Sequence, residues 1–166
     1  MPDYTCNRNN NTIYYSGRIC QEGIMYLKQC LDNLDTEKKS TFYITSGGGE
    51  VYAGLFLYDL IAQQNPALFS IVVCGFCASA ATMCLFATEN VSMYKNARLL
   101  FHPISFSLYD VKQPDAISYV AECEELTKVC LEIENQKLKT PIGWENKEVY
   151  INAKQALDLG IVKEII

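Results

Sequence analysis

Several residue types and patterns are scarce in this chain, and each absence argues against a class of protein. The 166 residues contain one histidine and one tryptophan, so a histidine-rich metal centre has too few ligands. No run of about eighteen apolar residues occurs, which argues against a membrane-spanning helix. The polar beginning, MPDYTCNRNNNT, lacks the apolar core of a signal peptide. We therefore expect a cytoplasmic location and no membrane partner.

Positive charge is also in short supply. The chain has 14 Lys and Arg against 19 Asp and Glu, which gives a formal net charge of −5. A surface dominated by phosphate contacts needs an excess of positive charge, so we expect no nucleic-acid partner. Hydrophobic residues make up 49% and charged residues 20%, which is typical of a globular protein and argues against disorder.

Hydrophobic patterning predicts strands that alternate with helices from residue 12 onward. Residues 1–11 are polar and are expected to form a loose N-terminal arm ahead of one domain over 12–166. Alternating strands and helices indicate an α/β fold with a largely parallel sheet. Strands are expected at 12–16, 41–45, 68–74, 91–93, 97–101 and 161–165, with an extended piece at 105–109. Helices are expected at 20–34, 51–64, 78–87 and 115–139, and between a capping box at Asn152 and a stop at Gly160.

The segment VVCGFCASAATMCLF, residues 71–85, holds three of the eight cysteines. Cys74 and Cys77 have the spacing of a dithiol redox motif, which needs an exposed thiol with a lowered pKa. A metal site would need further ligands, and no second C-x-x-C motif or histidine pair is present. Because Cys74 continues an apolar run, we expect buried free thiols, with no metal and no cofactor. A redox dithiol remains the alternative.

Ser79 follows the same apolar run among small residues. A serine acts as a nucleophile only with a nearby base and with donors for the developing oxyanion. A turn from a strand into a helix would supply free backbone N–H groups. The alternative interpretation is a helix N-cap or a packing residue.

Two further features follow predicted strands. His102 is the only imidazole available as a base, and the alternative interpretation, which its local sequence alone favours, is a structural histidine. The turn Ser46-Gly-Gly-Gly49 exposes N–H groups and permits close backbone approach, but it lacks the Gly-Lys-Ser/Thr ending of a phosphate loop. Since the carboxyl ends of parallel strands meet at one edge of a sheet, we expect this turn, Ser79 and His102 to form one site.

These segments resemble the proteolytic subunit of the Clp protease, the ClpP family of serine peptidases, from Thr12 to Ile166. ITSGGGEVYAGLFLYDLI is similar to the family's strand, Ser-Pro-Gly-Gly turn and helix, with Gly47 in place of the usual proline. CGFCASAATM is similar to the nucleophile turn, with Cys77 where alanine is usual, and its form is closer to shorter, phage-type or accessory members. ARLLFHP resembles the segment with the catalytic histidine, and EVYINAKQALDLGIVKEII resembles the C-terminal acid, cap, helix and strand.

The resemblance implies a ClpP/crotonase-like fold, a long handle helix and a serine endopeptidase. Ser79 takes the place of the nucleophile and His102 that of the general base. The family's aspartate falls on Glu148, with Asp110 and Glu145 as the other candidates. The remaining roles are an oxyanion hole from the backbone of Gly49 and Ala80, and a substrate strand held along Gly48 and Glu50.

The resemblance also implies peptide or unfolded-protein substrates and a homo-oligomer, either a heptamer or two stacked heptamers. Family members carry a longer N-terminal segment that meets an ATPase ring, whereas residues 1–11 are short and polar, which argues against a Clp-type ATPase partner. Two alternatives remain for the function. One is a catalytically weak or inactive scaffold subunit of the same fold, and the other is a crotonase-type acyl-CoA enzyme.

Overall fold

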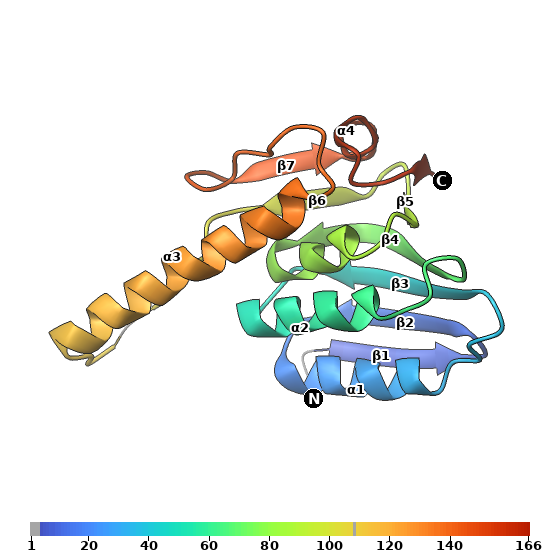
Figure 1. The fold of residues 1–166 in the computed structure, drawn as a ribbon, viewed down its shortest axis with the longest axis horizontal. Helices are drawn as coiled ribbons and strands as arrows, with labels where there is room; N and C mark the ends of the chain where they lie inside the picture. The colour runs from blue at the N-terminus through green and yellow to red at the C-terminus, as the bar shows by residue number, and fades with distance from the viewer. Residues whose placement is uncertain (1–3, 108) are drawn as a thin grey trace.

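A computed structural model describes residues 4–107 and 109–166 and contains one large sheet with helices packed against it (Figure 1). The strands are β1 Tyr4–Asn9, β2 Thr12–Gly17, β3 Ser40–Ser46, β4 Phe69–Ala78, β5 Val91–Met93, β6 Arg98–Phe101, β7 Val149–Asn152 and β8 Glu164–Ile165. The helices are α1 Gln21–Asp32, α2 Val51–Ala62, the 3-10 helix η1 Ser79–Phe86, α3 Gln113–Asn135 and α4 Ala153–Leu159. Among the described residues, no helix is both long and apolar enough to cross a membrane.

The sheet is largely parallel, as the alternation of strands and helices predicts. Its order is β1-β2-β3-β4-β5-β8, and all of these neighbours pair in parallel except β1 with β2. β4 is shared by two partners, because its first half pairs with β5 and its last residues pair with β6. β6 in turn pairs antiparallel with β7. The expected α/β fold is therefore confirmed.

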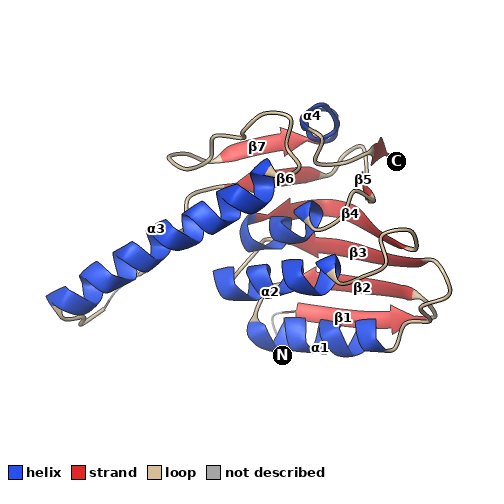
Figure 2. Ribbon diagram, in the orientation of Figure 1, coloured by secondary structure: helices blue, strands red, loops and turns tan. Residues whose placement is uncertain are grey.

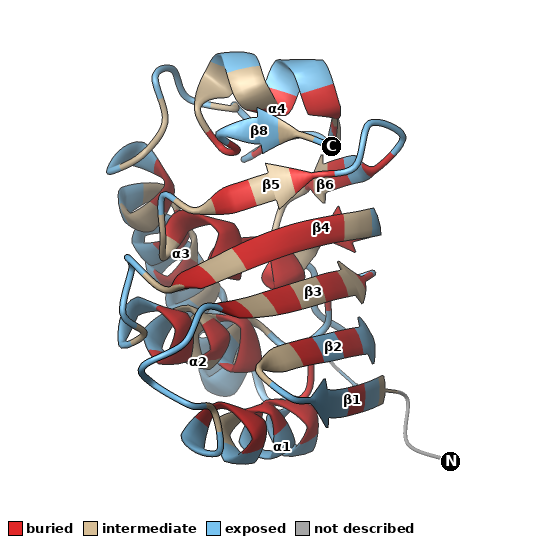
Figure 3. Cartoon of the chain, turned by 90° about the vertical axis from the view of Figure 1, so that its right-hand side faces the viewer, coloured by how far each residue is buried: buried red, intermediate tan, exposed pale blue. Residues whose placement is uncertain are grey.

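One face of the sheet carries the core. Burial alternates along β2 and β3, which is the pattern of strands with one covered face. Figures 2 and 3 show α1, α2 and η1 against that face. The apolar positions at helical spacing in α1, among them Ile24, Leu27 and Leu31, are buried there. These helices pack on the covered face of the sheet and hold the loops at its edge in place.

The N-terminal residues correct one expectation. Tyr4–Asn9 form β1 and not a loose arm, and β1 pairs with β2 along its whole length. The register places Asn9 opposite Thr12, so Asn10 and Asn11 form a two-residue hairpin loop. Asn10 has a φ of 53°, a left-handed conformation that asparagine tolerates better than most residues. The Asn-Asn pair is thus a hairpin signal inside a polar stretch.

β4 continues past Gly75, where the sequence suggests a break. Between two paired positions β4 advances from Val73 to Cys77 while β3 advances only from Ile44 to Ser46. Gly75, with a φ of 65°, lies in this bulge, where glycine accommodates the bend. Beyond the bulge β4 turns from β5 to β6, which directs the chain toward the helix that follows.

Three other expectations are adjusted. The segment expected as a helix at 78–87 is the 3-10 helix η1, and β7 is a strand that the patterning did not predict. No strand is assigned to the described residues of 105–109, and residue 108 lies outside them. The capping box at Asn152 and the stop at Gly160, which has a φ of 85°, are confirmed.

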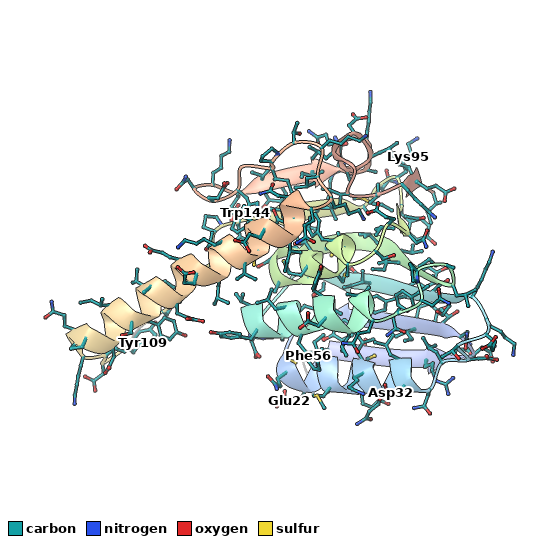
Figure 4. All side chains as sticks on the ribbon, in the orientation of Figure 1. Glu22, Asp32, Phe56, Lys95, Tyr109 and Trp144 are labelled. Atoms are coloured by element: carbon teal, nitrogen blue, oxygen red, sulfur yellow. The ribbon has the colours of Figure 1, made fainter. Side chains whose placement is uncertain are left out.

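The long helix α3 extends away from the body (Figure 1). Its only buried residues among those described are Leu126, Cys130 and Glu134, all in its C-terminal half. Figure 4 places Trp144 beside this buried end and Tyr109 beside the far end. α3 therefore contributes one end to the body and leaves most of its length exposed.

Candidate active site

The three features expected at one edge of the sheet do meet there. The turn after β3, Ser79 after β4 and His102 after β6 line a single cavity of about 220 Å³. The parallel pairing of β4 with β3 and β6 brings the carboxyl ends of these strands together. The topology of the sheet, with its switch at β4, thus creates the site.

Ser79 is held in an unusual backbone conformation. Its φ is 54°, in the left-handed region that residues other than Gly, Asn and Asp seldom occupy. It is the first residue of η1, and Thr82 Oγ1 donates a 2.7 Å hydrogen bond to its carbonyl oxygen. Strain of this kind persists only where the surroundings impose it, and it gathers at functional sites.

The glycine turn supplies those surroundings. A Cβ on Gly48 would lie 2.6 Å from Ala78 O and 2.7 Å from Ser79 Cβ, so only glycine allows the turn to touch the serine segment. Gly48 has a φ of 90°, which adds a second reason for glycine at this position. The turn and the nucleophile candidate are therefore packed as one unit.

The same turn presents a free backbone edge. The amide of Ile19 donates to Gly48 O, and the amide of Glu50 donates to Ile19 O, both at 2.9 Å. In such a parallel bridge the residue between, Gly49, directs its N–H and C=O to the opposite side. The Gly49 N–H has no hydrogen-bond partner among the described residues, and Gly49 lines the cavity.

A second amide, that of Ala80, lies in the first turn of η1. Amides there have no acceptor inside the helix. α2 packs closely on this residue, since a Cβ on Gly54 would lie 2.6 Å from Ala80 O. Both expected oxyanion residues, Gly49 and Ala80, therefore border the cavity that holds Ser79.

A backbone carbonyl group fixes which ring nitrogen of His102 carries the proton. Its Nδ1 lies 2.7 Å from the carbonyl oxygen of Pro103. Since a carbonyl oxygen only accepts hydrogen bonds, Nδ1 is the donor, and Nε2 of the neutral ring keeps its lone pair. The side chain is half-buried and faces the cavity. This tautomer is the one that a general base requires.

The carboxylates expected beside His102 do not contact it. Glu148, Asp110 and Glu145 are all exposed, and within the described part of the chain no hydrogen bond or ion pair joins any of them to the imidazole. Glu148 is nevertheless near in register, because Phe101 pairs with Val149 and the next positions along the two strands are His102 and Glu148.

The contacts of the Glu50 side chain indicate a structural role. It lies 3.8 Å from Arg18 Nη2 as an exposed ion pair and accepts a 3.3 Å hydrogen bond from the amide of Gln21. These contacts join the start of α2 to the start of α1. Its backbone belongs to the bridge with Ile19, so Glu50 holds the turn from one side.

The sequence did not predict the part of the cavity wall that is formed by Cys130 and Glu134 from α3 and by Trp144 from the loop that follows it. The indole N–H of Trp144 donates a 2.7 Å hydrogen bond to Glu134 Oε2. Burial raises the pKa of Glu134 to about 7, with a further contribution from Glu145, while the Trp144 bond opposes the shift. The spacing of Leu126, Cys130 and Glu134 along one helix face was the available signal.

The cysteine motif lacks the features of a redox site. Burial raises the pKa of the Cys74 thiol and raises that of the fully enclosed Cys77 thiol much further. A reactive dithiol needs the opposite shift. Among the described residues, no group of three or more Cys, His, Asp or Glu side chains is arranged to hold a metal ion. The expectation of buried thiols holds for Cys77, which is enclosed in the core, whereas Cys74 is only half-buried.

Comparisons with known proteins agree with this geometry. Residues 10–166 match the Clp protease family. The ATP-dependent Clp protease proteolytic subunit of Dehalococcoides mccartyi is 28% identical over 141 residues, which cover 82% of this chain and 70% of that one. Subunit 2 of Treponema pallidum is 28% identical over 172 residues, which cover 93% and 81%.

A solved structure extends the likeness to three dimensions. A variant of ClpP1 from Listeria monocytogenes superimposes with a TM-score of 0.73 at 25% identity, covering 94% of this chain and 91% of that one. The fold is thus the ClpP-like fold that the sequence segments predict. The family match over nearly the whole chain and the site at the sheet edge lead to the same conclusion: the chain belongs to the Clp protease family.

Proposed function

We propose that this chain is a serine endopeptidase that cleaves peptides or unfolded protein segments. The observation that carries the proposal is the meeting of Ser79, His102 and the amides of Gly49 and Ala80 around one cavity. Ser79 Oγ attacks the scissile carbonyl carbon while His102 Nε2 takes the hydroxyl proton. The imidazolium then gives that proton to the leaving amine, and a water molecule, deprotonated by the same imidazole, releases the acyl group.

The backbone around the serine supports this chemistry. The Gly49 and Ala80 amides would donate to the oxyanion that forms on the carbonyl oxygen, without reorganising during the reaction. The outward edge of Gly49 would pair with an extended substrate, as an added strand does at a sheet edge. The inner edge of the turn, at Gly48 and Glu50, is already bonded to Ile19 and keeps the outer edge in place.

Glu148 is the proposed carboxylate of the triad, on the basis of its register opposite His102. The Pro103 carbonyl already holds the Nδ1 proton in place, so the carboxylate is needed less for the tautomer than for stabilising the imidazolium. We expect Glu148→Gln to lower kcat by about 10²-fold, less than the roughly 10⁴-fold effect known for a triad carboxylate.

One observation favours a second candidate, a catalytically weak or inactive scaffold subunit. Among the described residues no carboxylate contacts His102. A decayed site of the same fold would keep the cavity and lose the activity. No comparable observation favours an acyl-CoA enzyme.

A fluorophosphonate probe tests the peptidase against the scaffold. We expect the purified full chain to form an adduct on Ser79 that is absent in Ser79→Ala and forms at least 10²-fold more slowly in His102→Ala. Ser105→Ala is the matched control, because Ser105 lines the same cavity and its loss should leave labelling intact. An unlabelled Ser79 in a folded chain would favour the scaffold.

Assembly belongs to the same proposal. The exposed apolar side chains near the start of α3, Ile117, Tyr119 and Val120, suit contacts between copies of the chain. We propose a homo-oligomeric ring, either a heptamer or two stacked heptamers, that encloses the cavities. A Clp-type ATPase partner is a further possibility that follows from the names of the relatives.

A further inference from the structure

Glu134 is a buried acid in the wall of the cavity that holds Ser79. Its side chain is 2% exposed and lies at the body end of α3. Carboxylates are seldom buried so fully without a cationic partner. None of the four ion pairs among the described residues involves Glu134. An acid in this position needs an explanation.

The nearby cation, Lys137, binds groups other than Glu134. Lys137, one turn further along the chain, donates to the carbonyl oxygens of Leu85 and Thr88 at 2.8 and 2.6 Å. These bonds tie the chain that follows α3 to the end of η1. Lys137 therefore binds carbonyl groups at the end of η1 and just after it, and Glu134 has no cationic partner among the described residues.

The two carboxyl oxygens of Glu134 have different surroundings. Oε2 accepts the hydrogen bond from Trp144 Nε1. This bond holds the loop after α3 in place, so it gives Oε2 a structural role. Oε1 has no hydrogen-bond partner among the described residues. Every fully enclosed side-chain oxygen or nitrogen described there does have one, so Oε1 is not sealed off. Because Glu134 lines the cavity, Oε1 opens onto it.

Part of the remaining wall is apolar. Met83, Phe101, Ile104 and Trp144 face the same space, whose volume of about 220 Å³ is below the roughly 300 Å³ of a typical small-molecule site. A single long side chain suits this size. Apolar walls that lead to one carboxylate match a side chain with an aliphatic stem and a cationic tip.

We infer that this cavity receives the substrate side chain directly before the scissile bond, and that Glu134 selects lysine or arginine there. The inference rests on the proposed peptidase function. The scissile carbonyl would lie between Ser79 and the amides of Gly49 and Ala80, so the side chain of the same residue is the one that reaches the cavity. A charge-assisted hydrogen bond from the substrate cation would then replace the partner that Glu134 lacks.

Binding of agmatine, which copies the arginine side chain, tests the inference without catalysis. The assay uses the full chain with Ser79→Ala and follows the fluorescence of Trp144, the only tryptophan, with calorimetry as the second measurement. We expect saturable binding that weakens at least tenfold with Glu134→Gln, a change that keeps an oxygen for Trp144. Glu132→Gln, at an exposed position on the same helix, should leave the affinity unchanged.

Neutral N-butylurea provides a comparison that needs no variant at position 134. We expect it to bind at least tenfold more weakly than agmatine, because it lacks the charge. Equal affinities for the two compounds, equal agmatine affinities with and without Glu134→Gln, or no agmatine binding would each overturn the inference.

Cleavage links the pocket to the proposed reaction. Peptides that differ only at the residue before the scissile bond should show kcat/KM in favour of arginine over leucine. Glu134→Gln should lower that ratio by 10- to 100-fold and Glu134→Leu should reverse it, while Glu132→Gln keeps it. A ratio that favours leucine in the unmodified chain would overturn the inference. If no peptide is cut and Ser79 takes no probe, the proposed function fails, and agmatine binding still decides the role of Glu134.

Discussion

At the scale of single residues, Ser79 shows a conflict between stability and function. A left-handed φ costs an L-residue about 1–2 kcal/mol, whereas glycine adopts it freely. At this position, with a φ of 54°, glycine would give a more stable folded state than serine does. Retention of the hydroxyl there is what a nucleophile requires.

The first prediction follows from this strain. Ser79→Gly should raise the free energy of unfolding by about 1 kcal/mol, since glycine's greater freedom in the unfolded chain offsets part of the relief. Ser79→Ala keeps the strain and should change stability by less than about 0.5 kcal/mol. Urea denaturation of the three proteins measures both values. A Ser79→Gly protein less stable than Ser79→Ala would show that the conformation is not strained.

The second prediction concerns Glu134 and pH. Its folded pKa of about 7 lies above the ordinary value of 4.5 because of burial. The folded state therefore binds the proton more tightly, and this stabilisation is complete below about pH 4.5 and is lost as the pH rises through about 7. The shift corresponds to about 3 kcal/mol in total.

Comparison with Glu134→Gln isolates this effect. The variant is neutral at every pH, so its free energy of unfolding relative to the unmodified chain should rise by about 3 kcal/mol between pH 4 and pH 8. The groups that interact with Glu134, namely Trp144, Glu145 and Cys130, are present in both proteins. A constant difference across that range would contradict the pKa shift.

The sequence was sufficient to predict that Ser79 and His102 lie at one edge of the sheet, because each follows an apolar run that forms a strand. It was insufficient for Glu134, because its spacing from Leu126 and Cys130 is the one available signal and does not by itself single out one glutamate on an acidic helix. Glu134 becomes buried only when the loop that contains Trp144 packs against α3, and the local sequence around Glu134 does not show that contact. The register that places Glu148 opposite His102 depends on a strand, β7, that patterning missed, because a four-residue strand gives too short a period.

At the scale of elements, the turns after β3 and β4 act as one unit. Gly48 lies against Ala78 and Ser79, whereas a Cβ on Gly47 would meet nothing within 4 Å. The two neighbouring glycines are thus in opposite situations. One is required by close packing and by its φ of 90°, and the other is free.

This contrast gives the third prediction. Gly48→Ala should lower the free energy of unfolding by about 2–4 kcal/mol, from steric overlap and from the left-handed φ. It should also slow probe labelling of Ser79. Gly47→Ala is the matched control and should change stability by less than about 0.5 kcal/mol. Thermal unfolding and labelling rates measure both, and equal effects at the two positions would contradict the packing argument.

The elements themselves were predicted well where periodicity is long and poorly where it is broken. α1, α2 and most of α3 follow from apolar spacing, and the parallel strands follow from their apolar runs. β1 was missed because its residues are mostly polar and only Cys6 is buried in it. The continuation of β4 through Gly75 was missed because a bulge depends on the register with β3 and not on local sequence.

At the scale of the whole molecule, α3 is the helix whose N-terminal half stays largely exposed in a single copy. Ile117 is 63% exposed and Val120 is 44% exposed, on the part of the helix that extends from the body (Figure 1). Apolar side chains grouped on such a projecting helix are typical of a surface covered by another copy. The buried end of the same helix carries Glu134, so the proposed assembly and the cavity would share this helix.

The last prediction tests this use of α3. Ile117→Lys together with Val120→Lys should reduce the native mass, to about half if two rings stack through α3, because charge placed in an apolar contact is costly to bury. The fold should persist, since both side chains are exposed in the single chain. Gln29→Lys on the exposed side of α1 adds one positive charge elsewhere, half of that in the double variant, and should leave the mass unchanged. Native mass spectrometry reads the outcome, and a double variant of unaltered mass would exclude this face of α3 from the contact.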